Sequence, residues 1–305
     1  MSARKLPSLS ALRAFEAAAR HRSAKAAAQE LSVTPTAISH QLRQLEDYLG
    51  IALFVRKPRQ LVLTGAGQTL LAASSEAFDR LADTVARLRQ DPGHQTVTLS
   101  TIPAVAGRFL LPWVCLLRES HPHLNLNLRI SHDLVALDGV DADMAIRYGD
   151  GHWPGLVSEK LFDNVFVPAC SPALGITRYQ DLHRHTLLHY QPPSHSGALL
   201  SWTTWQKLAR VPGLDMGAGL VFSDETHTIT AALGGQGIAL MSKALIADEL
   251  ASGRLVQPFG PDLHAKPFHL VYPEERLREP AIAAVREWVL GLKEGIARKQ
   301  TEATT

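Results

Sequence analysis

Four side chains between residues 36 and 43 combine hydrogen-bonding capacity with positive charge. Thr36, Ser39, His40 and Arg43 are spaced so that they share one face of a helix, and none of them is acidic. An arginine can bind guanine or a phosphate, and Thr, Ser and His side chains can meet phosphates or base edges. Either this face contacts DNA or it is an ordinary solvated helix face, and the surrounding pattern favours DNA.

Three short helical patterns occupy residues 9–19, 23–31 and 34–50. The third begins at Thr34, a good N-cap, followed by Pro35, whose missing N–H costs nothing at the first helical position. Gly50 is placed to end it. Together they predict a helix-turn-helix motif from Ala24 to Arg43, whose second helix enters the major groove. The inward positions are expected to be Leu9, Leu12, Phe15, Ala19, Ala26, Ala27, Leu31, Ile38, Leu42, Leu45 and Leu49.

A basic turn follows the third helix. Residues 51–56 and 60–64 are short extended runs, which predicts a β-hairpin wing with Arg56, Lys57 and Arg59 at its tip. Such cations could clamp phosphates and thereby raise affinity without choosing a sequence. Residues 1–64 carry ten Lys/Arg against four acids, a net charge of +6, whereas the remainder carries −4. This asymmetry suits a polyanion-binding head on a separate body.

Residues 65–89 have the pattern of one long helix. Leu71, Ser74, Phe78, Leu81, Val85 and Leu88 alternate steps of three and four, which is the seam of a coiled coil. The seam either packs on its own domain or pairs two chains. Pairing is favoured, because it would place two reading heads on a two-fold-related site. We therefore expect Leu71, Phe78, Leu81, Val85 and Leu88 to dimerise.

From Gln95 onward, strand and helix patterns alternate. This predicts an α/β body with mostly parallel sheets, divided into two subdomains that hold a ligand between them at strand ends. The boundary to the head is marked by Asp91-Pro92-Gly93. The expected strands are residues 97–100, 124–130, 144–147, 165–168 and 237–241, and the expected helices are 104–119, 202–209, 229–233 and 281–292.

Other functional classes find little support. No apolar run approaches the about 20 residues of a membrane span, and no export signal is recognisable, so we expect a cytoplasmic protein without a membrane partner. His183, His185 and His189 match neither helix nor strand spacing and are expected to be surface residues, not metal ligands. No nucleophile or paired-carboxylate pattern appears, so neither an enzyme nor a cofactor is expected.

The two cysteines, Cys115 and Cys170, have no metal-like spacing and are too far apart in sequence to suggest a disulfide framework. Cys115 lies in an apolar helical pattern beside Leu116 and Leu117, which predicts a packed thiol. Cys170 lies in a proline-flanked turn pattern, which predicts the more reactive thiol.

The chain as a whole resembles the LysR-type transcriptional regulators. The resemblance is dense in residues 14–20, 26–46, 53–56 and 63–67. In the body, Ile146-Arg147-Tyr148-Gly149-Asp150-Gly151 with Pro154-Gly155-Leu156 is similar to the subgroup that contains the glycine-cleavage activator and the β-lactamase regulator, as is the run 234–240.

The resemblance implies a winged helix-turn-helix, mainly α, over 1–64 and a dimerising linker helix over 65–92. An α/β, periplasmic-binding-protein-like effector domain of two lobes would occupy 93–305, with lobe I near 93–167 and 268–295 and lobe II near 168–267. It also implies the partners: double-stranded promoter DNA, a small-molecule effector such as a small acid or amino-acid-like compound, RNA polymerase, and the chain itself as homodimer or homotetramer.

The site residues follow from the same resemblance. The implied DNA contacts are Thr34, Pro35, Thr36, Ser39, His40, Arg43 and Arg56. The implied effector pocket is lined by Ser100, Thr101, Ile102, Pro103, Ala104, Ser131, His132, Arg147, Tyr148, Phe222, Asp224 and Thr226.

The chain departs from the subgroup after the first strand of the body. Many members carry Ser-Phe-Ala or Gly-Thr-Phe-Ala there, whereas here Pro103 removes a donor and Ala104 removes a hydroxyl. Ser100 and Thr101 are the available substitutes, and the effector could equally differ from those of the named relatives.

Two other classes of function remain as alternatives. A small-molecule binding protein that had lost DNA recognition should carry acids or prolines across the face of Thr36 to Arg43, and neither occurs there. An enzyme with an accessory DNA module would need a catalytic constellation, which the sequence does not offer.

Overall fold

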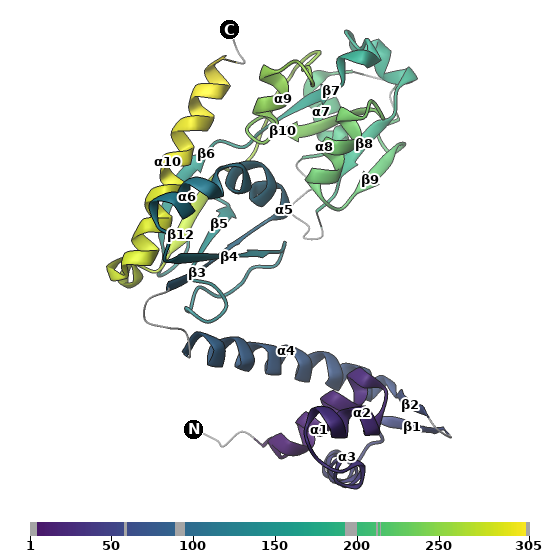
Figure 1. Cartoon of the computed structure of the whole chain (residues 1–305). Coiled ribbons are helices and arrows are strands. Elements are labelled where there is room, and N and C mark those ends of the chain that lie inside the picture. The colour runs from purple at the N-terminus through teal and green to yellow at the C-terminus, as the bar shows by residue number, and fades with distance from the viewer. Residues whose placement is uncertain are drawn as a thin grey trace. The chain divides into compact units, whose positions relative to one another are not determined.

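The computed structural model describes residues 5–57, 60–88, 95–192, 200–211, 213 and 215–302. The chain divides into two units, residues 1–89 (the head and its long helix) and residues 90–305 (the body). Figure 1 shows both units with their elements labelled. Within the described ranges, no helix has the length and apolar character that crossing a membrane requires.

Hydroxyl caps begin the three helices of the head. The side chains of Ser8, Ser23 and Thr34 each accept a backbone N–H three residues further on, at 3.2 Å. These bonds satisfy donors that the first turn of a helix leaves free. Gly50, at φ 68°, ends the third helix in the left-handed region that glycine tolerates. The helices are α1 (Leu9–His21), α2 (Ala24–Glu30) and α3 (Pro35–Leu49).

The core of the head is rich in alanine, which lets the helices approach closely. Phe15 and Leu45 are fully buried at its centre. Three expected inward positions differ: Leu9 and Leu49 are exposed, and Ala28 is buried in place of Ala26. Leu9 is the first residue of α1, beyond the reach of the core. The chain turns away at the end of α3, because the Glu46 carboxylate accepts the N–H groups of Leu53 and Phe54 at 2.7 and 3.2 Å. Those two residues then fill the core instead of Leu49.

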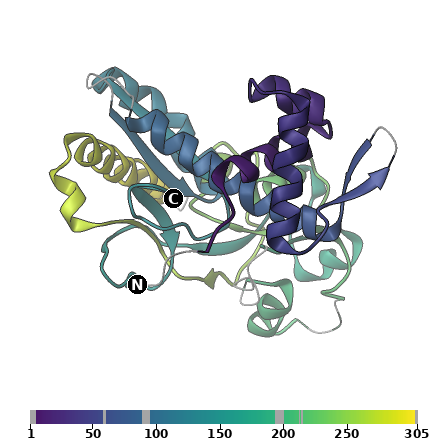
Figure 2. The same cartoon turned by 90° about the horizontal axis from the view of Figure 1, so that it is seen from below.

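A two-stranded hairpin follows, formed by β1 (Phe54–Lys57) and β2 (Gln60–Leu63). Figure 2 shows it extending outward from the helices of the head. The long helix α4 (Gly65–Leu88) begins directly after it. Thr64 caps α4 through the N–H of Gly67 at 3.0 Å. A Cβ at Gly67 would lie 2.2 Å from the Leu53 carbonyl oxygen, so this close approach requires glycine.

The body contains two five-stranded sheets, one in each lobe. Lobe I has the strand order β4-β3-β5-β12-β6 and lobe II the order β11-β7-β10-β8-β9. Each sheet joins parallel pairs, such as β3 with β4, to antiparallel pairs, such as β7 with β10. The expectation of mostly parallel sheets was therefore wrong. The strands are β3 (Gln95–Thr101), β4 (Leu124–Ile130), β5 (Met144–Tyr148), β6 (Val157–Phe162), β7 (Val165–Cys170), β8 (Leu187–Tyr190), β9 (Leu220–Phe222), β10 (Ile238–Ser242), β11 (Leu263–His264) and β12 (Phe268–Tyr272).

The chain crosses between the lobes twice, from β6 to β7 and from β11 to β12. The two crossings run beside each other, because the Ala265 N–H donates to the Asn164 carbonyl oxygen at 2.9 Å. Since β7 already belongs to the second sheet, lobe I gives way to lobe II near residue 164, a few residues before the approximate boundary at 168 that the resemblance implied.

The helix expected over residues 104–119 is broken. It consists of α5 (Pro103–Val105), a π-helical turn at Ala106–Leu110, a 3₁₀ turn at Leu111–Trp113 and α6 (Val114–Ser120). Pro112 has no N–H for a continuous helix, which accounts for the interruption. The other helices of the body are α7 (Trp202–Ala209), α8 (Glu225–Leu233), α9 (Ala247–Ala251) and α10 (Pro280–Glu302), with 3₁₀ turns at Pro172–Leu174, Tyr179–Arg184 and Glu274–Arg278.

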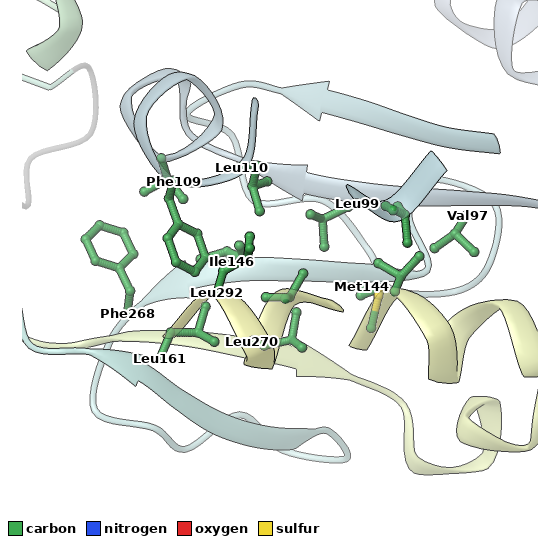
Figure 3. Close-up of a cluster of buried hydrophobic side chains, with 14 of the residues drawn as sticks. Val97, Leu99, Phe109, Leu110, Met144, Ile146, Leu161, Phe268, Leu270 and Leu292 are labelled. Carbon is green, nitrogen blue, oxygen red and sulfur yellow. The ribbon is translucent and has the colours of Figure 1, made fainter. Parts of the chain in front are cut away.

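The main hydrophobic core lies in lobe I. Leu99, Met144 and Leu270 from its sheet pack with Phe109 and Leu110 of the interrupted helix (Figure 3). Helix α10 contributes Val285, Val289 and Leu292 to the same cluster. Ala244 and Leu245, which follow the lobe II strand β10, also belong to it. Lobe II therefore inserts part of its chain into the core of lobe I.

Candidate functional site

The polar face of α3 is open to solvent. Thr36, Ser39, His40 and Arg43 are all exposed on this helix. The Ser39 hydroxyl donates to the Pro35 carbonyl oxygen at 3.0 Å, which leaves its oxygen free to accept a further bond. The arrangement presents hydrogen-bonding groups and one guanidinium on a single helix.

The remaining predicted contacts differ in their surroundings. Thr34 is engaged as the cap of α3, and Pro35 is its first residue, so both shape the start of the helix. Arg56 lies in β1, but its side chain is outside the part of the chain that the structure describes, as is that of Lys57. Arg59 also lies outside the described residues.

The acids of the head are mostly engaged elsewhere. Arg20 bonds to Glu16 and Glu30 at 2.8 and 2.7 Å, and His21 contacts Glu30 at 2.5 Å. Hydrogen bonds from Arg20, then His21, lower the pKa of Glu30 to about 2. Glu46 is occupied by backbone N–H groups, as described above. In the described residues, no carboxylate forms an ion pair with Arg43, whose charge is therefore available to a polyanion.

The predicted dimerisation seam on α4 is divided. Leu71 packs against the core of its own head, and Ser74 beside it is buried. Phe78 is half-buried, whereas Leu81 and Val85 are 55% and 46% exposed. The side chain of Leu88 lies outside the described part. Among the side chains of α4 that the structure describes, the large exposed apolar ones are therefore Leu81 and Val85.

A cavity of about 350 Å³ lies between the two lobes of the body. It brings together seven of the predicted effector residues: Ser100, Thr101, Ile102, Ser131, His132, Arg147 and Tyr148. The sequence missed several others that line it, namely Asp133, Leu134, Val135, Ala145, Ile146, Asn164, Phe166, Tyr190, Pro192, Leu200, Glu225 and Phe268. Glu225 directly follows the predicted Asp224, but no sequence signal distinguished the two carboxylates.

Five predicted pocket residues do not line the cavity: Pro103, Ala104, Phe222, Asp224 and Thr226. Ala104 is instead buried in the core of lobe I. Asp224 caps α8 by accepting the Thr226 N–H at 2.7 Å, and its other oxygen lies 3.6 Å from Nε2 of His132. That separation exceeds hydrogen-bond length, yet it places a lobe I imidazole beside a lobe II carboxylate. The departure at Pro103 and Ala104 therefore does not alter the cavity wall directly.

The cavity has charged groups of both signs. Arg147 donates to the Val135 carbonyl oxygen at 2.5 Å, and burial lowers its pKa. Glu225 is 3% exposed and accepts the Ser242 N–H at 2.8 Å. Burial raises the pKa of Glu225 to about 7; the Ser242 bond opposes this shift, and the negative charge of Asp224 adds to it. Tyr190 has a raised pKa because of burial and these same two carboxylates.

Several polar atoms at the cavity wall are buried without a hydrogen-bond partner in the described residues. They are Oγ1 of Thr101, Nε2 of His132 and Oδ1 of Asn164. Buried polar groups are nearly always satisfied in folded proteins. These atoms therefore mark a wall that a polar ligand, or a movement of the lobes, could satisfy.

The described ranges contain no cluster of three or more His, Cys, Asp or Glu residues that could hold a metal ion. The two thiols reverse the sequence expectation: Cys115 is exposed, and Cys170 is fully buried. Burial raises the pKa of Cys170 to about 11, which disfavours its reactive thiolate. Cys170 lies inside β7 and not in a turn, and the broken helix turns Cys115 outward.

Comparison with known proteins agrees with this arrangement. Residues 9–68 match the model of the bacterial regulatory helix-turn-helix proteins of the lysR family, and residues 90–293 match the LysR substrate binding domain. The glycine cleavage system transcriptional activator of Escherichia coli K12 is 36% identical over 94% of this chain and 94% of its own. The HTH-type transcriptional activator AmpR of Pseudomonas aeruginosa is 34% identical over 92% of this chain and 94% of its own.

Solved structures show the same fold. The effector domain of AmpR from Pseudomonas aeruginosa covers 68% of this chain and all of its own, with 27% identity and a TM-score of 0.55. CrgA, a LysR-type transcriptional regulator from Neisseria meningitidis, covers 94% of this chain and 99% of its own, with 21% identity and a TM-score of 0.54. This chain and CrgA thus share the fold of a helix-turn-helix head with a two-lobed α/β domain, and the AmpR effector domain shares the fold of the body.

Proposed function

Since this chain belongs to the LysR family of DNA-binding transcription regulators, we propose that its head reads promoter DNA through α3 and that a small molecule in the inter-lobe cavity controls it. The observation that carries the proposal is the exposed face of Thr36, Ser39, His40 and Arg43, on which Arg43 has no ion pair in the described residues. Such a face suits the major groove, where Arg, Ser, Thr and His side chains read base edges.

Two further groups of residues complete the proposed DNA interface. Thr34 and Pro35 set the start of α3, whose N-terminal end carries a partial positive charge that favours phosphate. Arg56 lies on the hairpin beside the helices and is assigned to backbone phosphates. In this arrangement the helix supplies sequence choice and the hairpin supplies affinity.

The proposed effector residues are those of the cavity wall. We retain Ser100, Thr101, Ile102, Ser131, His132, Arg147 and Tyr148 and add Asn164, Tyr190 and Glu225. A ligand that contacts both lobes would favour one lobe arrangement over another, and that preference is what an effector needs in order to act. The protein would thus work by binding and not by catalysis.

The proposed assembly is a homodimer or a homotetramer. Leu81 and Val85 on α4 provide an exposed apolar strip that pairing of two α4 helices would bury. Two heads would then meet a two-fold-related DNA site. We propose that the protein acts on the chromosome in the cytoplasm and that RNA polymerase is its partner there.

Genome-wide mapping of the DNA bound by the full-length chain tests this function. We expect discrete promoter sites that share a two-fold-related motif, and loss of these sites in an Arg43→Ala variant. Uniform, weak occupancy by both proteins would contradict sequence-specific regulation. Adding the effector should change occupancy or transcription at the same promoters.

A further inference from the structure

The inter-lobe cavity carries one cation, Arg147, and one buried carboxyl group, Glu225, that form no ion pair within the described residues. The other carboxylate of the wall, Asp133, is exposed and accepts the Ser131 hydroxyl at 3.0 Å. Arg147 lies on β5 of lobe I, and none of the described carboxylates lies within ion-pair distance of it. Glu225 begins α8 of lobe II, and its only hydrogen bond in the described residues comes from the Ser242 N–H. A buried charge without a counter-charge is costly, and a ligand of opposite charge relieves that cost.

Three further buried polar atoms of the wall have no hydrogen-bond partner within the described residues. On the side of lobe I, Thr101 is 3% exposed, and its hydroxyl has no partner in the part of the chain that the structure describes. At the crossing between the lobes, Asn164 is also 3% exposed, and its unpartnered Oδ1 is an acceptor. Lobe I therefore offers the Thr101 hydroxyl and Nε2 of His132 as unpartnered groups, and the crossing between the lobes offers the Asn164 amide oxygen.

The rest of the wall is largely apolar. Ile102, Val135, Ile146, Phe166 and Phe268 surround the polar groups. A cavity of about 350 Å³ with such a wall suits a small molecule that has an apolar portion.

We propose that the effector is a small zwitterion of the amino-acid class, whose carboxylate binds Arg147 and the Thr101 hydroxyl and whose ammonium group binds Glu225 and the Asn164 carbonyl oxygen. The two charged ends would then bridge lobe I and lobe II directly. This inference rests on the proposed function, because it assigns a ligand class to the same cavity. Neither end alone would hold both lobes.

Matched probes test the assignment on the full-length chain. Thermal unfolding is recorded with each standard protein amino acid, and also with simple carboxylic acids, amines and sugars. For any amino acid that raises Tm, calorimetry compares it with the acid that lacks its amine and the amine that lacks its carboxylate, as for L-leucine, 4-methylpentanoate and 3-methylbutylamine. We expect each truncated probe to bind about 10–100-fold more weakly, as loss of one charged hydrogen-bonded contact predicts.

Two variants identify which wall holds which end. Glu225→Gln should weaken binding of the amino acid but not binding of the acid that lacks the amine. Arg147→Gln should weaken binding of the amino acid and of that acid, but not binding of the amine that lacks the carboxylate. Arg129→Gln and Asp150→Asn remove single charges outside the cavity wall and should leave all three affinities unchanged.

The outcomes separate this inference from the proposed function. If a plain acid binds as tightly as the amino acid and only Arg147→Gln weakens it, the zwitterion assignment fails and the effector cavity stands. If no amino acid raises Tm but a sugar or amine does so through the cavity residues, the assignment fails in the same way. If a probe binds and neither cavity variant affects it, the cavity is not the effector site and the proposed function fails with it.

Discussion

Nη1 of Arg108 in lobe I lies 2.5 Å from Oε1 of Glu249 in lobe II, so a partly buried ion pair joins the two lobes. The Glu249 side chain is 2% exposed, and Arg254 bonds to the same oxygen at 3.0 Å. Beside this pair, Ala244 and Leu245 enter the core of lobe I. Any change in the angle between the lobes must therefore accommodate both a salt bridge and an apolar contact.

Removing Arg108 should destabilise the body. Arg108→Ala would leave the Glu249 carboxylate with Arg254 alone, and we expect a loss of about 1.5–3 kcal/mol, the usual range for a hydrogen bond to a charged group. Urea unfolding of the full-length chain measures the difference. Lys160→Ala breaks the exposed pair with Asp163 and should cost less than about 1 kcal/mol. Equal losses would mean that the inter-lobe pair contributes no more than a surface pair.

Arg43 should be the side chain of α3 that most affects DNA sequence choice. Arg43→Ala is expected to weaken operator binding by about 1–3 kcal/mol if the guanidinium binds a guanine bidentately. Fluorescence anisotropy on an operator and on scrambled DNA measures both affinities. An equal loss on both DNAs would make Arg43 a phosphate contact instead. Arg118→Ala, an exposed arginine of α6, serves as the control and should change neither affinity.

The exposed strip of α4 should control self-association. Leu81→Asp combined with Val85→Asp places charges where two α4 helices would meet, so we expect a shift toward monomer in sedimentation velocity and weaker operator binding. Glu76→Arg changes the opposite face of α4 and should leave the assembly unchanged. Persistence of the native assembly in the double variant would place the interface elsewhere.

The sequence predicted the head more closely than the body, for a physical reason. Caps, a proline at the start of α3 and Gly50 are local signals, and they mark the helix ends without help from distant residues. The antiparallel strands β6 and β12 have no such signals. Their pairing depends on contacts between residues more than 100 positions apart, such as Val157 with Tyr272. The mixed sheets could therefore not be deduced from alternation alone.

The cavity was only partly predictable for the same reason. Ser100, Thr101 and Arg147 follow or end strands, where ligand residues are expected. Asn164 lies at the crossing between lobes, and Glu225 differs from Asp224 only in the direction that its side chain takes from α8. Burial and direction are properties of the assembled fold, which explains why the sequence selected the neighbouring carboxylate.

Glu225 should make the stability of the body depend on pH between about 4.5 and about 7. Burial raises its pKa from 4.5 to about 7, so the folded chain holds a proton that the unfolded chain releases across this interval. The free energy of unfolding that this group contributes therefore falls as pH rises through the interval and is constant above it. The charges acting on Glu225 come from Asp224 and Arg108, and it also accepts the Ser242 N–H.

The variant Glu225→Gln keeps an acceptor for the Ser242 N–H but cannot ionise. Its free energy of unfolding, relative to that of the original chain, should rise from near zero at about pH 4.5 to a plateau above pH 7, reaching up to about 3 kcal/mol. Urea unfolding of both proteins at several pH values across this range measures the difference. The contributions of the other titratable groups cancel, because both proteins contain them. Asp150→Asn, which removes an exposed carboxylate, should give no such rise. If the difference in free energy of unfolding between Glu225→Gln and the original chain does not change with pH, water in the cavity solvates the Glu225 carboxylate. Its proposed contact with an ammonium group would then be weakened by solvent.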